Sequence, residues 1–218
     1  MSSGRILLEA VVETADAAVA AEDAGASRLE LCANLHDDGT TPDGAVLEAV
    51  LARVRIPVFV MIRPRAGDFV YSEDELAVSE RAIDEVTARG AAGLVLGVLQ
   101  RDRSVNVAAT RRLVARGQGV PVTFHRAFDS APDLLVALDD ILVAGVTRVL
   151  TSGGAPTASE GVAALADLVR HSRGRAVIMA GGGVRAHNVA AVVARTGVSE
   201  IHARFESGAQ IRAMVDLL

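Results

Sequence analysis

Lysine is absent from this 218-residue sequence, and all 22 of its basic residues are arginine. This absence excludes mechanisms that need a lysine amine, among them Schiff-base aldolase chemistry, pyridoxal phosphate chemistry and the P-loop. Tryptophan is also absent, tyrosine occurs once, and the arginines do not cluster in runs. With a formal net charge of −5, the chain lacks both the basic surface and the stacking side chains of a nucleic-acid-binding protein.

Cysteine is nearly absent, because Cys32 is the only one. A single thiol excludes an intrachain disulfide and a Cys-x-x-Cys zinc site, and the composition does not call for an oxidising compartment. There is no apolar run of 18 residues, and Glu9 and Glu13 interrupt the segment where a signal peptide would need its apolar core. We therefore expect a soluble, cytoplasmic protein without a membrane partner.

Half of the residues are hydrophobic, and short β-rich runs alternate with longer, alanine-rich segments. Strands are predicted at Arg5–Ala10, Arg28–Cys32, Val58–Arg63, Gly93–Gly97, Val122–Arg126, Arg148–Ser152, Ala176–Ala180 and Glu200–Ala203. Strand–helix units of about 27 residues, repeated eight times, are what a (β/α)8 TIM barrel requires. Since no linker divides the chain, residues 1–218 are predicted to form a single α/β domain. An open doubly wound sheet is the alternative, because alternation alone does not show closure.

Local signals support the barrel. Before every second predicted strand, a glycine stands where a helix would end in the left-handed conformation: Gly25, Gly90, Gly145 and Gly197. Pro57 and Pro121 precede two of the other strands, at a position that tolerates a missing N–H. The segment Ser72–Glu75 is a capping box that begins a helix. This repeated pairing favours a closed barrel over an open sheet.

Polar or glycine-rich sequence ends most of the predicted strands, and in a barrel these ends meet around one pocket. The candidate catalytic residues there are Glu9, Glu30, His125, Asp129 and His202. The candidate anion-binding residues are Asn34, Arg63, Arg65, Arg126, Ser152, Gly153, Gly182 and Gly183. Arginine fixes anions but hardly transfers protons, so a general base has to be a carboxylate or an imidazole.

Several candidates have a structural alternative. Glu9 needs a cation if buried, and we expect Arg63, Arg126 or a ligand to supply it. Arg28 and Glu30 could form a structural ion pair inside the barrel. The last glycine-rich loop leads into a helix predicted at Val184–Asn188, whose N–H groups suit a phosphate. The glycines can equally serve the turns alone.

Soft metal donors are few, and they lie at or near strand ends: Cys32, His125 and His202, with Met61 and Met179 inside strands. Thiolate, imidazole and thioether together suit copper(I). A structural zinc site would need more cysteine than the sequence has. For the methionines, core filling is the simpler interpretation.

Segments spread over nearly the whole chain share their order and pattern with one family: Leu8–Thr14, Arg28–Leu35, Gly39–Pro42, Val60–Tyr71, Thr123–Asp129, Leu150–Gly153 and Gly181–Arg185. Met-Ile-Arg-Pro-Arg and Phe-His-Arg-Ala-Phe-Asp are the most specific among them. In these segments the sequence resembles the CutC family of copper-homeostasis proteins. The resemblance implies a cytoplasmic TIM barrel, often a homodimer, that is connected with copper handling.

The chain departs from the family pattern at three places. Val11 stands where the family commonly has cysteine, so only Cys32 of a two-thiol copper site would be present. Asp38 replaces a common glycine and is expected to stiffen or recharge its loop. Arg204 follows His202 where small residues are usual, and it is expected to fill part of the pocket or replace a lost contact.

Two functions follow from these observations. The resemblance and Cys32 favour copper homeostasis, with copper(I) as the ligand. The polar ring favours a barrel enzyme for a small anionic or phosphorylated substrate, with Glu9 or Glu30 as base, His125 or His202 as acid, and arginines as the anion clamp. A ring that is entirely structural is the third possibility.

Overall fold

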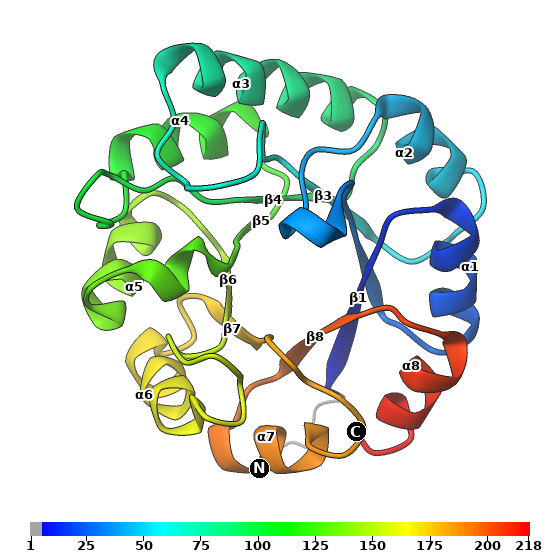
Figure 1. Ribbon diagram of the computed structural model, residues 1–218. Coiled ribbons are helices and arrows are strands. Elements are labelled where there is room, and N and C mark those ends of the chain that lie inside the picture. The colour runs from blue at the N-terminus through cyan, green and yellow to red at the C-terminus, as the bar shows by residue number, and fades with distance from the viewer. Residues whose placement is uncertain (1–5) are drawn as a thin grey trace.

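The computed structural model describes residues 6–218, which form a closed barrel of eight parallel strands surrounded by helices (Figure 1). The strands are β1 (Leu7–Val12), β2 (Arg28–Leu31), β3 (Val58–Met61), β4 (Gly93–Leu96), β5 (Val122–Phe124), β6 (Arg148–Thr151), β7 (Val177–Ala180) and β8 (Glu200–Arg204). β8 pairs with β1 and places Glu9 beside His202. The predicted TIM barrel is therefore confirmed, and the open sheet is wrong.

The helices form the outer ring in Figure 1. They are α1 (Ala15–Asp23), α2 (Gly44–Leu51), α3 (Glu73–Ala88), α4 (Val107–Arg116), α5 (Leu134–Val143), α6 (Val162–Ser172), α7 (Val189–Thr196) and α8 (Gly208–Val215). Two 3-10 turns, η1 (Leu35–Asp37) and η2 (Arg126–Ser130), follow β2 and β5. Within the described residues, no helix has the length and apolar character needed to cross a bilayer.

Two kinds of local sequence signal are present in the structure: the capping box and the glycines before the strands. The capping box at Ser72 and Glu75 is present at the start of α3. The four glycines before the even-numbered strands all have positive φ, between +73° at Gly197 and +99° at Gly25. A side chain would strain the backbone at these turns, so the sequence signal is a direct consequence of backbone geometry.

Side chains on the strands alternate between two environments. Those facing outward, such as Leu29 and Val60, join the large apolar core between strands and helices. Those facing inward include a small separate cluster of Val11, Cys32, Phe59, Met61 and Val95. The barrel interior therefore has less apolar packing than the outer core and leaves room for polar groups.

Most predicted strand ends differ from the structure by one or two residues, and two of the differing boundaries bear on the site. The first strand extends to Val12 instead of ending at Ala10, because the β-branched Val11 and Val12 continue the pairing with β8 and β2. Glu9 therefore lies inside the barrel; Arg5 falls outside the described residues. The segment Val184–Asn188 forms turns, and α7 begins only at Val189. The Asn188 side chain there accepts the Arg185 N–H and donates to the Gly183 carbonyl, which stabilises a turn instead of a helix.

Candidate active site

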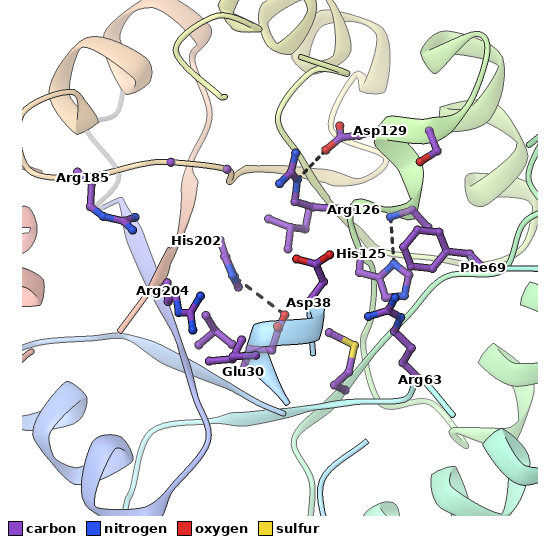
Figure 2. Close-up of a pocket in the computed structure, with 18 residues that line it drawn as sticks. Glu30, Asp38, Arg63, Phe69, His125, Arg126, Asp129, Arg185, His202 and Arg204 are labelled. Atoms are coloured by element: carbon purple, nitrogen blue, oxygen red, sulfur yellow. Dashed lines mark hydrogen bonds and ion pairs between the residues drawn. The ribbon is translucent and has the colours of Figure 1, made fainter. Parts of the chain in front are cut away.

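A cavity of about 470 Å³ opens at the carboxyl ends of the strands (Figure 2). It is lined by eight of the residues predicted for the site: Glu30, Arg63, His125, Arg126, Asp129, Gly182, Gly183 and His202. The other predicted residues lie outside its wall. Glu9, Cys32 and Ser152 are fully buried, while Asn34 and Arg65 line a separate hollow of about 370 Å³ beside the loop after β3.

A buried ion network lies beneath the cavity. Arg28 donates to both Glu9 and Glu200, and Arg148 donates to Glu200 at 2.6 Å. Both guanidinium groups also lie over the Phe59 ring, at 4.9 and 5.3 Å from its centroid. The predicted pairing of Arg28 with Glu30 is thus wrong, as is the expectation that Arg63 or Arg126 neutralises Glu9. The strand register explains both, because it sets Glu9 directly opposite Arg28.

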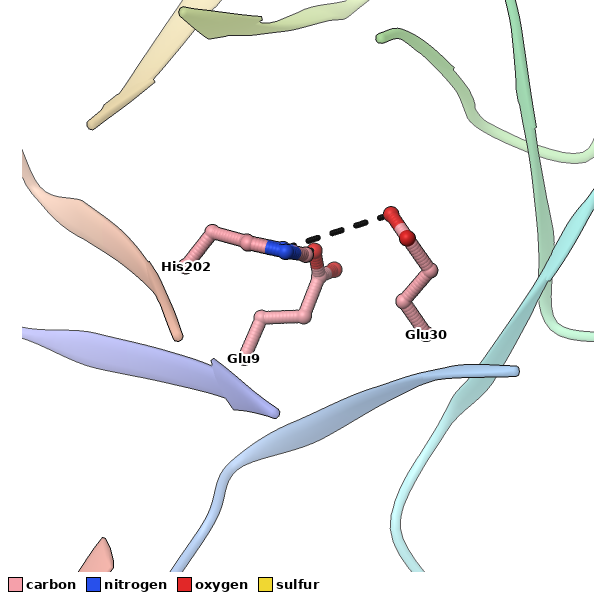
Figure 3. Close-up of side chains that lie close together, drawn as sticks. All are labelled: Glu9, Glu30 and His202. Atoms are coloured by element: carbon pink, nitrogen blue, oxygen red, sulfur yellow. Dashed lines mark hydrogen bonds and ion pairs between the residues drawn. The ribbon is translucent and has the colours of Figure 1, made fainter. Parts of the chain in front are cut away.

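Glu9 and His202 form a carboxylate–imidazole pair above this network (Figure 3). His202 Nδ1 lies 2.8 Å from Glu9 Oε1. Burial alone would raise the pKa of Glu9, but the bond from His202 and the charge of Arg28 lower that pKa to about 2. Burial likewise opposes a charged His202, yet the charge of Glu30 and the bond to Glu9 raise its pKa. Glu9 is therefore ionised, and its charge favours the protonated form of His202.

Glu30 is a buried carboxyl group in the wall of the cavity, without a hydrogen-bond partner among residues 6–218. The nearest cation is His202, with Nδ1 4.0 Å from Oε2 (Figure 3). Burial raises the pKa of Glu30 to about 7, and the charge of His202 limits the rise. Glu30 thus has the affinity for protons that a general acid or base needs at neutral pH.

His125 lies on another wall of the cavity, just after β5, and is held as a neutral ring. Its Nδ1 accepts the Ala127 N–H at 3.1 Å, which places the ring proton on Nε2. Burial, and then the charge of Arg63, lower the pKa of His125 to about 3. No described residue accepts from Nε2. His125 can therefore donate one hydrogen bond to a ligand without carrying a charge.

Two residues that sequence reasoning missed shape the His125 wall. The Phe69 ring packs against the imidazole with the centroids 5.0 Å apart. Gly97 gives the ring its space, because a Cβ atom at this position would lie 2.6 Å from it. A glycine at the end of a buried strand was the available signal, since glycine there often marks a close approach.

The three arginines predicted to bind an anion are already engaged by the protein. Arg63 donates to the carbonyls of Asp37, Gly39 and Gly67 at 2.8 to 2.9 Å. Its guanidinium thereby joins η1 to the loop after β3. Arg65 forms ion pairs with Glu75 at 2.5 Å and Asp68 at 2.9 Å, away from the main cavity.

The arginines on the opposite side of the cavity also have acidic partners. Arg126 pairs with Asp129 at 2.8 Å, and Arg185 pairs with Glu206 at 2.6 Å. Asp129 further accepts from Thr151 at 2.5 Å and from the Gly154 N–H at 3.0 Å. These bonds join the loops after β5 and β6, so Asp129 positions its neighbours.

The glycines near Asp129 serve close packing. A Cβ atom at Gly153 would lie 2.6 Å from the Gly161 carbonyl oxygen, and one at Gly181 would lie 2.4 Å from Leu150. At Gly182 it would lie 3.3 Å from the Arg126 guanidinium carbon. Gly182 and Gly183 nevertheless expose backbone to the cavity. The glycines therefore have a structural reason that is independent of any bound phosphate.

Possible metal ligands occur in two places. Glu9, Glu30 and His202 offer ligand atoms within 4.8 Å of one another, but Glu9 is already paired with Arg28 and His202. Cys32 is fully buried, and burial together with the charge of Glu30 raises its thiol pKa. Its sulfur and the Met61 methyl group each lie 3.5 Å from the Cβ position of Gly39, so two soft donors pack around one glycine.

Comparison with known proteins identifies the family. Residues 6–207 match the model of the CutC family. The chain is 43% identical over 196 residues to the Homo sapiens copper homeostasis protein cutC homolog, covering 90% of this chain and 72% of that one. The crystal structure of CutC from Streptococcus agalactiae has a TM-score of 0.86 and 36% identity, covering 90% of this chain and 97% of that one. Thiamine phosphate pyrophosphorylase from Pyrococcus furiosus shares the fold alone, with a TM-score of 0.67, 13% identity, and coverage of 98% and 95%. The chain belongs to the CutC family of copper-homeostasis proteins, as its segments predicted.

Proposed function

We propose that this CutC protein is an acid–base enzyme that moves a proton on a small substrate carrying an anionic group. The observation that carries the proposal is the free, buried carboxyl group of Glu30 in the same cavity as the unpartnered Nε2–H of His125. A buried acid without a partner lowers stability, so a fold keeps such a group when its reactivity is used.

In the proposed reaction, Glu30 takes a proton from a carbon next to a carbonyl group. His125 donates a hydrogen bond from Nε2 to the carbonyl oxygen, on which negative charge develops as the proton leaves. The same Glu30 carboxyl then returns the proton to the former carbonyl carbon of a substrate that carries a hydroxyl group on the first carbon, and the hydroxyl proton moves to the former carbonyl oxygen, so that a new carbonyl group forms on the first carbon. A carboxylate base combined with a neutral imidazole donor is a known solution for this type of proton transfer.

In this scheme, Glu9 and His202 set the pH range over which Glu30 can both take and return a proton. Glu9 holds the His202 imidazolium by a 2.8 Å bond, and the imidazolium faces Glu30 at 4.0 Å. Its positive charge keeps the pKa of Glu30 from rising further than about 7. Near neutral pH, Glu30 is therefore present in both protonation states, as the two halves of the reaction require.

A substrate-independent experiment tests the proposal. A mixture of small metabolites is incubated in deuterium oxide with the wild type or with Glu30→Gln, and carbon-bound deuterium is followed by mass spectrometry. We expect one compound to gain deuterium with the wild type and at least about a hundredfold more slowly with the variant. Asp68→Asn, a change outside the cavity, is the control. Equal incorporation by wild type and Glu30→Gln would contradict the role of Glu30.

Copper(I) binding is the second candidate, supported by the family and by the contact of Cys32 and Met61 with Gly39. The chain fits such a site only in part. Val11 lies in the same apolar cluster as Cys32 and Met61, at a position where the family commonly has cysteine. We expect the weak affinity of a single thiol. In an anaerobic copper(I) titration against a chelator, Cys32→Ala removes this binding, while Val11→Cys tightens it at least about a hundredfold. Unchanged copper(I) affinity in Cys32→Ala would show that the Cys32 thiol is not a copper ligand.

A homodimer in the cytoplasm is the setting that we propose for this activity. The outer face of α5 supports self-association, since Val136 and Val143 are 57% and 64% exposed there. Exposed apolar groups of this size favour burial against a partner. Light scattering on Val136→Asp with Val143→Asp tests the dimer, and a dimer that persists would place the interface elsewhere.

A further inference from the structure

Two charged groups in the cavity remain without a partner among residues 6–218. Asp38 follows η1, and Arg204 ends β8. Arg126 and Arg185, in contrast, have carboxylate partners, and the Arg63 guanidinium is bound by backbone carbonyls. The described part of the chain therefore leaves the Arg204 guanidinium and the Asp38 carboxylate free at the cavity, in addition to the acid–base group Glu30 and to the Arg63 Nε, which has no partner.

Asp38 is held in place at a conformational cost. Its φ is +63°, in the left-handed region that favours glycine, and the same turn begins at Asn34 with φ +55°. Arg63 fixes this turn on both sides of Asp38, through the carbonyls of Asp37 and Gly39. The Leu35 N–H, at the start of η1, donates to Glu13 at 2.9 Å. The carboxylate is thus presented to the cavity from an anchored turn.

Arg204 approaches the cavity from another element. It lies opposite Val11 in the β8–β1 register, two residues after His202 on the same strand. Successive alternate residues of a strand share a face, so Arg204 and His202 both belong to the inner face of β8. Figure 2 shows Arg204 beside His202, with Asp38 reaching toward the cavity from η1.

We propose that the substrate is a small zwitterion, with its anionic group on Arg204 and a protonated amine on Asp38. This inference rests on the proposed function, because it names the substrate class of the same cavity. A phosphate-like dianion on the Arg204 guanidinium would face the charges of Asp38 and Glu30. A molecule with one charge of each sign satisfies both free groups and leaves its carbon skeleton between them, next to Glu30.

The experiment measures binding separately from catalysis. Straight-chain amino acids from glycine to 6-aminohexanoate, which carry the amine at the far end, are titrated by calorimetry against the protein. Carboxylates and alkylammonium ions of the same lengths are titrated in parallel. We expect the best zwitterion to bind at least about tenfold more tightly than either singly charged analogue. No binding of any zwitterion, or equal binding of the matched carboxylate, overturns the proposal.

Variants assign the two charges. Asp38→Asn should reduce the affinity of the best zwitterion to that of its carboxylate analogue, and Arg204→Gln should reduce it to that of its alkylammonium analogue. Asp37→Asn and Arg101→Gln, which do not line the cavity, serve as matched controls and should retain the preference. If Asp38→Asn keeps the preference for zwitterions, the Asp38 carboxylate does not bind the amine and the proposal fails.

Two further variants separate the possible failures. Asp38→Gly should melt no lower than the wild type, since glycine suits the left-handed turn, yet it should lose the preference for zwitterions. If Asp38→Gly melts at the wild-type temperature and keeps the preference for zwitterions, the variant is folded and the proposal is contradicted. Glu30→Gln should retain the preference while deuterium exchange is lost. Retained preference with no exchange in the wild type would reject the acid–base function and leave the zwitterion site standing.

Discussion

The two histidines of the cavity lie in opposite electrostatic surroundings. His202, on the β8–β1–β2 wall, faces Glu9 and Glu30, and these carboxylates raise its pKa. His125, on the β5 wall, faces Arg63 and Phe69, and its pKa falls to about 3. Burial acts on both rings in the same direction, so the difference comes from the charges of their neighbours. One residue type thus supplies a cation on one wall and a neutral donor on the other.

The two walls also respond to pH in opposite ways. A raised folded-state pKa means that His202 contributes stability below its unfolded value of 6.5, and this contribution is lost as the pH rises through the folded pKa. A lowered pKa means that His125 costs stability as the pH falls from 6.5 toward about 3. The lowered pKa of Glu9 adds a loss of stability between pH 4.5 and about 2. Maximum stability is therefore expected between mildly acidic and neutral pH.

The largest effect is expected from removing the charge beneath the His202 wall. Glu9→Gln leaves Arg28 with Glu200 alone and takes the anionic partner from His202. Breaking a buried ion pair on one side costs about 3–5 kcal/mol of unfolding free energy. Urea denaturation at pH 7 measures the loss, with the exposed Glu48→Gln as control. A loss below about 1 kcal/mol would mean that the network contributes little to folding.

Removing the free acid from the same wall should have the opposite sign. The pKa of Glu30 is raised from 4.5 to about 7, so its ionisation opposes folding above this range. Glu30→Gln is therefore expected to stabilise the protein by up to about 3 kcal/mol at pH 9 and to change nothing below pH 4.5. Thermal unfolding across this pH range measures the difference, and a gain independent of pH would show that ionisation is not its cause.

A smaller effect is expected on the His125 wall. Gly97→Ala places a methyl group 2.6 Å from the imidazole and forces the ring to move. We expect a loss of about 1–3 kcal/mol, typical of overpacking, together with loss of the bond from the Ala127 N–H. The nitrogen chemical shifts of His125 report that bond. Gly90→Ala, at a turn where a Cβ atom has open space, controls for backbone strain at a glycine.

The unmodified protein provides the last comparison. Nitrogen-detected NMR should find His125 neutral at pH 5, with its proton on Nε2, while His202 is still protonated at pH 6.5. Because this measurement involves no substitution, no change in stability is expected. Two histidines that titrate together near pH 6.5 would show that the walls do not differ.

Much of the fold could be predicted from the sequence, because the signals are local. Alternation of strand and helix, the four left-handed glycines and the capping box each depend on a few adjacent residues. The ring of polar strand ends likewise identified Glu30, His125 and His202 as cavity residues. These predictions needed the order of the elements and no knowledge of their register.

The partners of the charged residues could not be predicted in this way. Arg28 binds Glu9 instead of Glu30 because the stagger of β1 against β2 sets them opposite each other, and this stagger is a property of the closed barrel. The arginines at strand ends were expected to hold an anion, yet their partners lie in loops whose paths the sequence does not reveal. Arg204, a departure from the family pattern, lines the cavity and has no ion-pair partner among residues 6–218.

The contact between Glu9 and His202 joins the first strand of the barrel to the last, across a sequence separation of 193 residues. During synthesis, the imidazole that completes this centre leaves the ribosome after all seven earlier strands. An open, partly folded barrel thus cannot contain the complete proton-transfer centre that we propose. Proton exchange at Glu30 would therefore report closure of the barrel. A chain in which β8 has not yet paired with β1 would show no exchange.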